Sequence, residues 1–341
     1  MNSETLSRRH LLMGAAAVAA PLMLAACGQG TPIDAEGRIR LRLAVPGPAR
    51  ADHGGFYQAI ANGFYAKRNL NVQITHGNSA DDVSRALASG NAELGLAQDS
   101  FAALRMVADK APVKAVAAFF QKDPRVLIAH GPRAPHNLSD IGQRSVFIED
   151  ANWSDFWYWL RNRYDLGNEQ LKRPENGAIA PFIEDDNSLL IGTLTREPAL
   201  VSSTDADIQP RLYLPADDGG YASYSNLLLT PNGFARDNAE ALRNFIAATV
   251  EGWHDYMNGD AEKAHNLIRR ANPATPQGSL TEARDLLKSF GIIEGGDAAL
   301  LGLGTMTEER WKTFAEQSSG AFTEAPDWKS AFTTQFLPSR R

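Results

Sequence analysis

The chain of 341 residues is nearly without cysteine, since Cys27 is its single example. One cysteine excludes an internal disulfide framework and any metal site built from several thiolates. Positive charge is not in excess either, because 34 lysine and arginine residues face 40 aspartate and glutamate residues, a formal net charge of -6. With no basic surplus, we expect the protein not to bind nucleic acid.

Several sequence patterns of enzymes are also missing. The chain has no Gly-x-Ser-x-Gly nucleophile elbow, no His-Glu-x-x-His metal site and no Gly-x-x-x-x-Gly-Lys-Ser/Thr phosphate loop. We therefore predict no catalytic residue, no metal and no cofactor, and a protein that is not an enzyme. Apolar runs long enough to span a membrane are missing too, because spanning takes about 20 residues and the longest candidate is 11–26.

The first 26 residues are typical of an export signal. Arg8 and Arg9 precede an alanine-rich apolar stretch, which resembles a twin-arginine signal and also fits the general secretory route. The stretch ends in small residues before Cys27, as in a bacterial lipobox, where the cysteine receives a lipid. The alternative is a plain secretory signal in which this cysteine is incidental. We expect an extracytoplasmic, membrane-anchored lipoprotein, in the periplasm or at the cell surface, with 27–37 as a polar tether.

After the tether, short apolar runs alternate with segments of helical periodicity. The runs 41–45 and 71–75 flank a segment whose apolar residues share one helical face, so that strand, loop, helix and strand form a βαβ unit. This alternation predicts an α/β protein with mostly parallel sheets. Because open α/β sheets bind ligands beyond the carboxyl ends of their strands, the loop 52–56 is expected to form one wall of a ligand cleft. An ordinary βα turn is the alternative.

A turn-rich break at 131–135 begins a second block of elements. There we predict a largely buried aromatic helix from Trp153, a strand at 177–183, a short helix at 188–194 and a short strand at 199–203. From 222 onward a strand and several helices are expected to complete the first domain. The predicted domains are 38–128 together with 222–341, and 129–221.

Four stretches carry a family resemblance, namely 52–59, 62–72, 86–95 and 138–144. Over about 38–337 the chain resembles ABC-transporter solute-binding proteins of the NMT1/THI5-like and aliphatic-sulfonate-binding type. The family usually has aspartate where Glu93 stands and a basic residue at Gln143, and 184–206 matches poorly. The resemblance implies a two-domain, periplasmic-binding-protein-like fold of type II, with crossing strands near 119–125 and 221–224 and a ligand cleft between the domains.

The resemblance also implies a function and a site. It implies a monomeric protein that captures a small molecule and delivers it to the membrane subunits of an ABC permease. The ligand would be contacted by loops after strands and by the hinge, from His53, Gly54, Gly55, Phe56, Asn78, Ser79, Gln98, Asp99, Ser100, Phe120, Asp150, Asn152, Trp153, Glu184, Tyr221 and Tyr224. For the acidic members, helix capping and solvated turns are the alternative. For His53, ligand contact and a turn role stay open, whereas no neighbouring pattern has metal spacing.

The candidate loops carry aromatic, amide and carboxylate groups but no lysine or arginine. This set favours an amine-bearing heterocycle, and we predict a pyrimidine-type thiamine precursor or a similar molecule. An aliphatic sulfonate, taurine or another small anion is the alternative, because Arg50, Arg125 and Arg144 are within possible reach of the cleft. A pyrimidine-synthesising enzyme of the same superfamily uses a cysteine-rich motif that is missing here. A membrane-tethered sensor would have the same binding body, and this alternative stays open.

Overall fold

The computed structural model describes residues 33–149, 154–204 and 208–338. The signal 1–26, Cys27 and most of the tether lie outside the described residues, as do the candidate site residues Asp150, Asn152 and Trp153. Within the described ranges, no helix combines the length and the apolar character that crossing a membrane requires.

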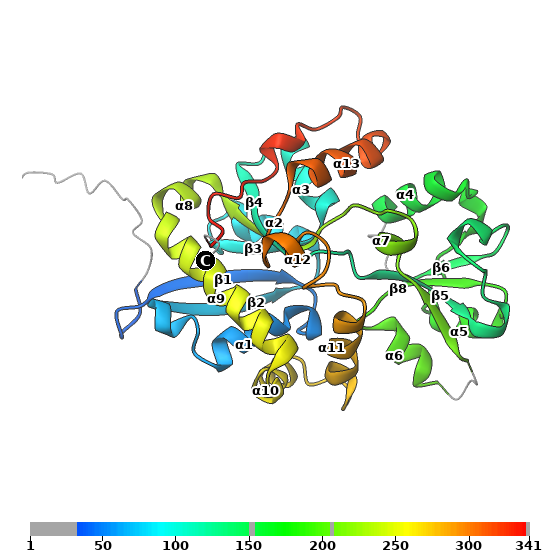
Figure 1. Cartoon of the computed structure of the whole chain (residues 1–341), viewed down its shortest axis with the longest axis horizontal. Helices are drawn as coiled ribbons and strands as arrows, with labels where there is room; N and C mark the ends of the chain where they lie inside the picture. Colours follow the sequence, from blue (N-terminus) through cyan, green and yellow to red (C-terminus); the bar gives the residue numbers. More distant parts are fainter. Residues whose placement is uncertain (1–32, 150–153, 205–207, 339–341) are drawn as a thin grey trace, which may run out of the picture.

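Two mixed five-stranded sheets form the frame of the molecule (Figure 1). The first has the order β2-β1-β3-β10-β4 and the second the order β7-β6-β8-β5-β9. The strands of the first sheet are β1 (Ile39–Pro46), β2 (Leu70–Gly77), β3 (Leu94–Asp99), β4 (Val113–Phe120) and β10 (Ser225–Pro231). Those of the second are β5 (Arg125–His130), β6 (Val146–Ile148), β7 (Leu171–Lys172), β8 (Leu189–Thr193) and β9 (Pro210–Tyr213).

The predicted α/β class is confirmed, and each sheet is mixed, because one strand of the five runs antiparallel to the other four. In the first sheet β1 is parallel to β2 and β3, whereas β10 is antiparallel to β3 and β4. In the second, β6 is parallel to β7 and β8, whereas β5 is antiparallel to β8 and β9. The antiparallel strands are the two that receive the chain from the other sheet, and each enters its new sheet against the direction of its neighbours.

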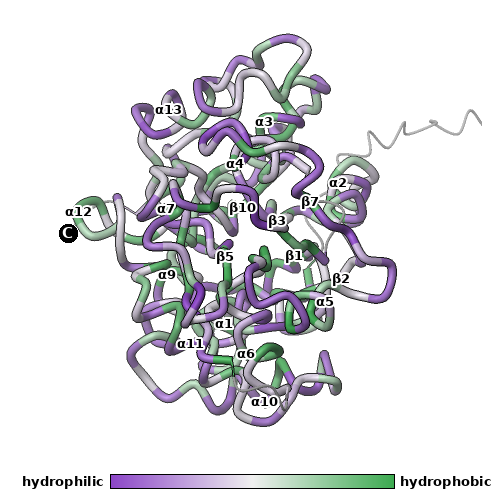
Figure 2. Tube along the Cα trace, turned by 90° about the vertical axis from the view of Figure 1, so that its right-hand side faces the viewer, coloured by the Kyte–Doolittle hydropathy of each residue, from purple (hydrophilic) through white to green (hydrophobic). Residues whose placement is uncertain are grey.

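Helices cover both faces of the sheets, and Figures 1 and 2 show the strands between two helical layers. One layer contains α1 (Gly54–Ala61), α5 (Ile179–Glu184), α6 (Glu197–Ser202), α9 (Ala239–Asn258), α10 (Glu262–Ala271) and α11 (Ser279–Ser289). The other contains α2 (Ala80–Ala88), α3 (Ser100–Ala108), α4 (Ser154–Tyr164), α7 (Pro215–Asp218) and α13 (Glu308–Ser318). Two further helices are short: α8 (Asn232–Asp237) directly follows β10, and α12 (Ala298–Leu301) directly precedes α13. Apart from Ala216 of α7, which packs against the cluster of the first layer, each layer buries its own hydrophobic cluster, and each cluster includes strand residues from both sheets.

Three elements of the second block differ from those predicted. The expected strand at 177–183 overlaps the helix α5, the expected helix at 188–194 contains the strand β8, and the expected strand at 199–203 overlaps the helix α6. The reason is clearest in β8, where Leu189, Leu190 and Ile191 are fully buried because both faces of a central strand are covered. A short continuous apolar run of this kind fits a buried strand and a buried helix equally well.

The chain passes between the sheets twice, at 121–124 after β4 and at 219–224 before β10. Both places agree with the crossings expected near 119–125 and 221–224. The domain limit predicted between 128 and 129 falls inside β5, which already pairs with β8 at Arg125 and Thr193. The chain has therefore joined the second sheet by Arg125. The other predicted domain limits stay a prediction.

Candidate functional site

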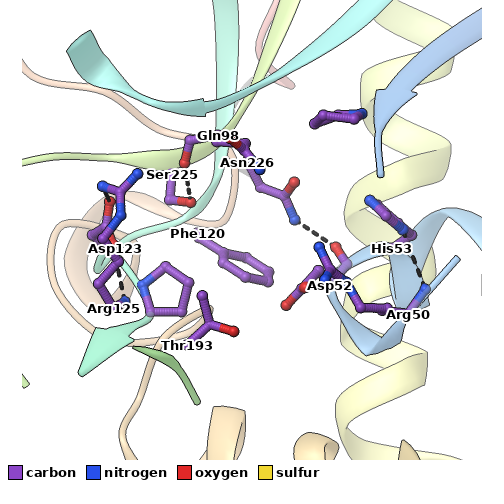
Figure 3. A pocket seen from close by; sticks show the side chains of 12 residues that line it. Arg50, Asp52, His53, Gln98, Phe120, Asp123, Arg125, Thr193, Ser225 and Asn226 are labelled. Atoms are coloured by element: carbon purple, nitrogen blue, oxygen red, sulfur yellow. Dashed lines mark hydrogen bonds and ion pairs between the residues drawn. The ribbon is translucent and has the colours of Figure 1, made fainter. Parts of the chain in front are cut away.

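A pocket lies where the two sheets meet, at the carboxyl ends of β1, β3, β4 and β8 (Figure 3). Its lining comes from both sheets and from the crossing between them: Pro46, Arg50, Asp52, His53, Gln98, Phe120, Asp123, Pro124, Arg125, Thr193, Ser225 and Asn226. Ligands of open α/β sheets bind at this kind of edge. The pocket is therefore the candidate site.

The loop after β1 brings a cation and an anion to the pocket. Arg50 Nε lies 3.4 Å from Asp52 Oδ2, while Asp52 Oδ1 is buried and has no hydrogen-bond partner among the described residues. The side-chain amide of Asn226 donates to the backbone carbonyl of Asp52 and so ties this loop to β10 (Figure 3). A buried carboxylate oxygen without a partner is costly unless a donor reaches it. The site therefore offers a charged acceptor to a ligand.

His53 is 3% exposed and stands at the edge of the same pocket. Burial, together with the positive charge of Arg50 and the neighbouring His76, lowers the pKa of His53 well below its ordinary value, so the ring is neutral at pH 7. The backbone N–H of Arg50 donates to His53 Nδ1 over 3.4 Å. A neutral ring that accepts at Nδ1 carries its hydrogen at Nε2, so His53 is a hydrogen-bond donor.

A buried ionic triad occupies the crossing at the back of the pocket. Arg125 Nη2 lies 2.6 Å from Asp99 Oδ2, and Arg125 Nη1 lies 2.9 Å from Asp123 Oδ2. Burial raises the pKa of Asp123 to about 6 against the opposing effect of Arg125, and the second carboxylate, Asp99, acts in the same direction as burial. Two carboxylates share one guanidinium here, so the triad has one negative charge in excess.

The second sheet contributes Thr193 at the end of β8. Its backbone N–H donates to Glu197 Oε2 over 2.6 Å, and its hydroxyl donates to the same oxygen over 3.2 Å. Glu197 is 1% exposed and its other oxygen accepts from Arg196 Nη1 at 2.9 Å. Burial raises the pKa of Glu197, while Arg196 and the Thr193 N–H oppose this shift.

Of the predicted site residues, His53, Gln98 and Phe120 come together in this pocket. The glycines before Phe56 have a different role from the ligand approach that their pattern predicted. A Cβ on Gly54 would lie 2.3 Å from the Tyr256 ring, and one on Gly55 would lie 2.2 Å from the Trp253 ring. They let α1 pack closely on α9, and Phe56 points into the core with an exposed fraction of 0%.

The structure places the other described candidates away from the pocket lining. Asn78 borders a second, open pocket beside α2, and Ser79 stands before that helix as its N-cap. Asp99 caps α3 by accepting from the Ala102 N–H at 2.9 Å and also holds Arg125. The remaining four are three buried residues near the second crossing and one exposed residue at the end of α5: Ser100, Tyr221, Tyr224 and Glu184.

Nine lining residues were not among the predicted contacts: Pro46, Arg50, Asp52, Asp123, Pro124, Arg125, Thr193, Ser225 and Asn226. Most of them flank the crossings, whose positions the sequence does indicate. Thr193 was hidden by the incorrect helix prediction for its segment. Of the three arginines considered for an anion, Arg50 and Arg125 line the pocket, whereas Arg144 donates to the carbonyls of Asp140 and Ile141.

Part of the chain that lines this pocket is similar to a known protein family. Residues 50–151, which include the loop after β1 and the first crossing, match the family model described as NMT1/THI5 like. This segment is NMT1/THI5-like. No curated protein sequence matches the chain.

Solved structures extend the similarity to the fold around the NMT1/THI5-like segment. The putative periplasmic sulfonate-binding protein SsuA from Methylobacillus flagellatus KT has 13% identity and a TM-score of 0.62, with 88% of this chain and 92% of that chain covered. The periplasmic aliphatic sulphonate binding protein SsuA from Escherichia coli has 13% identity and a TM-score of 0.62, with 86% and 96% covered. The desulfurization enzyme DszB has 9% identity and a TM-score of 0.53, with 87% and 97% covered. These similarities establish the periplasmic-binding-protein-like fold.

Proposed function

We propose that the protein is the solute-binding component of an ABC import system and captures a small molecule between its two sheets. The observation that carries this proposal is the pocket itself, which takes residues from both sheets and from the crossing that joins them. A ligand held there contacts both halves at once and stabilises their closed arrangement. The periplasmic-binding-protein-like fold supports the same role, and delivery to a permease is part of the proposal.

We propose binding without catalysis, although the DszB enzyme has the same fold. The lining holds both a serine and a histidine, which is a combination that catalytic sites use. However, the Ser225 hydroxyl donates to the backbone carbonyl of Gln98, and His53 Nδ1 accepts from the Arg50 N–H. The histidine nitrogen that would accept a proton is thus already occupied, and neither group activates the other.

The ligand proposed for this site is an amine-bearing planar heterocycle, such as a pyrimidine-type thiamine precursor. The free Asp52 Oδ1 offers an ionised acceptor, Phe120 offers an aromatic surface, and neutral His53 offers a donor. An aminopyrimidine presents an N–H group beside a ring nitrogen and a flat π-face, so it complements all three. A small sulfonate is the second candidate, because Arg50 Nε is also buried without a hydrogen bond among the described residues.

A thermal-shift screen separates the two ligand classes. The unfolding temperature is expected to rise with aminopyrimidines and to change little with taurine or alkanesulfonates, since a ligand that binds the native state stabilises it. Asp52→Asn is expected to weaken aminopyrimidine binding by about tenfold or more, because a neutral amide replaces the charged acceptor and its NH₂ group cannot accept. Asp81→Asn, an exposed change on α2, serves as the matched control and is expected to bind as the wild type does. The reverse ranking of ligands would reject the heterocycle and favour an anion site at Arg50.

We also propose that Cys27 is lipid-modified and tethers the binding body to a membrane. The proposal rests on the signal-like segment that ends at this cysteine and on the polar stretch that follows it. Cys27→Ser is expected to move the protein from the membrane fraction to the soluble fraction while ligand binding is kept. Membrane association that persists in this variant would reject the lipid anchor and leave the binding role untouched.

A further inference from the structure

The buried carboxyl group of Glu197, behind the pocket lining, fixes the direction of the hydrogen bond made by the Thr193 hydroxyl. A threonine hydroxyl has one hydrogen, and that of Thr193 donates to Glu197 Oε2. The side facing the pocket is left with lone pairs, so the hydroxyl can only accept there. In Figure 3 this hydroxyl points across the pocket toward Asp52.

Glu197 is held in this position by packing and charge. A Cβ on Gly192 would lie 2.5 Å from Glu197 Cβ, so only a glycine before Thr193 leaves room for the buried glutamate. Arg196 donates to Glu197 Oε1 at 2.9 Å and its other terminal nitrogen lies 3.2 Å from Glu149 Oε2. A carboxyl group that receives hydrogen bonds from three donors is a good acceptor and holds the Thr193 hydrogen on its own side.

We propose that Glu197 is a positioning residue that makes the pocket selective for ligands with an N–H donor, by fixing Thr193 as an acceptor opposite Asp52. The two acceptors come from different sheets, Asp52 from the loop after β1 and Thr193 from the end of β8. A ligand amino group has two hydrogens, and these can be shared between two facing acceptors. A ligand that donates to both Asp52 and Thr193 draws the two halves of the molecule together. A ligand that presents a lone pair at this point faces two acceptor oxygens and forms no hydrogen bond with either.

The inference rests on the proposed small-molecule role, and a matched pair of probes tests it. The probes are 4-aminopyrimidine and 4-methylpyrimidine, which have similar shapes but differ in the N–H donors. Isothermal titration gives the affinity ratio between them for each purified variant. The wild type is expected to prefer the amino compound by roughly tenfold or more.

Glu197→Gln is expected to reduce this preference by roughly tenfold. An amide oxygen in the place of Oε2 still accepts from the Thr193 N–H, but it is a weaker acceptor than a carboxylate oxygen, and the NH₂ group in the place of Oε1 faces the donor Arg196. The Thr193 hydroxyl is then held less firmly and its hydrogen can turn toward the pocket. Thr193→Val should reduce the preference without disturbing a buried charge, while Thr193→Ser should keep it. The matched control is Glu175→Gln, an exposed glutamate between β7 and α5 in the same half, which is expected to keep the wild-type ratio.

The outcomes separate the inference from the proposal beneath it. A wild-type preference that survives in Glu197→Gln, or affinities for both probes that fall by the same factor, would overturn the positioning role and leave the binding function standing. A preference lost in Thr193→Val but kept in Glu197→Gln would also overturn it. A wild-type protein that binds neither probe would overturn the amine-bearing ligand class, and the inference falls with it.

Discussion

At the residue scale, the pocket depends on a backbone conformation that few side chains adopt. Asn226 has a φ of 49° near the start of β10, in the left-handed region where asparagine and glycine are tolerated best. This conformation aims its amide at the backbone carbonyl of Asp52. One residue therefore joins β10 of the first sheet to the loop that carries the charged acceptor.

Two substitutions at Asn226 separate the conformation from the amide. Asn226→Gly keeps the positive φ but removes the donor, so we expect weaker aminopyrimidine binding with most of the stability kept. Asn226→Ala loses the donor and adds backbone strain, so its free energy of unfolding should be lower than that of the glycine variant by about 1 kcal/mol. Urea unfolding and isothermal titration measure the two effects.

The control for this pair is Asn69, which has a φ of 58° after the turn 66–68 and lies outside the pocket lining. Asn69→Gly and Asn69→Ala should show the same order of stability but unchanged binding. Wild-type affinity in Asn226→Gly would show that the Asn226 amide does not hold the Asp52 loop in a binding conformation.

At the element scale, the sequence predicted best where patterns are local. The unit β1-α1-β2 was predicted because its runs are flanked by turn residues and its helix has a clear apolar face. The segment 177–203 was predicted with helix and strand exchanged, because Phe182 and Ile191 are buried by partners distant in sequence, which a periodicity cannot reveal. The same error concealed Thr193.

The glycines of the loop 52–56 show a second limit of sequence reasoning. Their pattern drew attention to the right part of the chain, because Asp52 and His53 line the pocket. The sequence could not indicate that these glycines serve helix packing. The rings that leave no room for a Cβ belong to Trp253 and Tyr256, about 200 residues later in the chain. A glycine pair predicts close approach, but the sequence does not say what approaches.

At the scale of the whole molecule, the two halves are joined through charges that have little access to water. Asp123 lies in the first crossing with an exposed fraction of 1%, and Arg125 at the start of β5 links it to Asp99 at the end of β3. The pairing spans both sheets, so its protonation state affects the junction on which the pocket is built. Replacing one member of such a buried group is costly because the others stay behind.

The pH dependence of stability is expected to report on Asp123. Its pKa is raised to about 6 in the folded state from an unfolded value of 3.8, so the native protein binds the extra proton between these values. The contribution is fully present below pH 3.8 and is lost as the pH rises through 6. Between pH 4 and 7, the free energy of unfolding of the wild type relative to Asp123→Asn should therefore fall, by up to about 3 kcal/mol.

Asp34 provides a control of opposite sign, measured by the same urea unfolding series. Desolvation acts to raise its pKa, but hydrogen bonds from the Arg38 backbone and from Asn71 outweigh it and lower the pKa to about 2. Its stabilising contribution is present above the unfolded pKa and is lost only as the pH falls toward 2, so the difference between wild type and Asp34→Asn should stay level from pH 5 to 7. The prediction for Asp123 would be contradicted if the difference in free energy of unfolding between the wild type and Asp123→Asn stayed constant from pH 4 to 7. That result would mean that Asp123 and Asp99 are both ionised in the folded protein over this range, and that Arg125 alone stabilises both carboxylates.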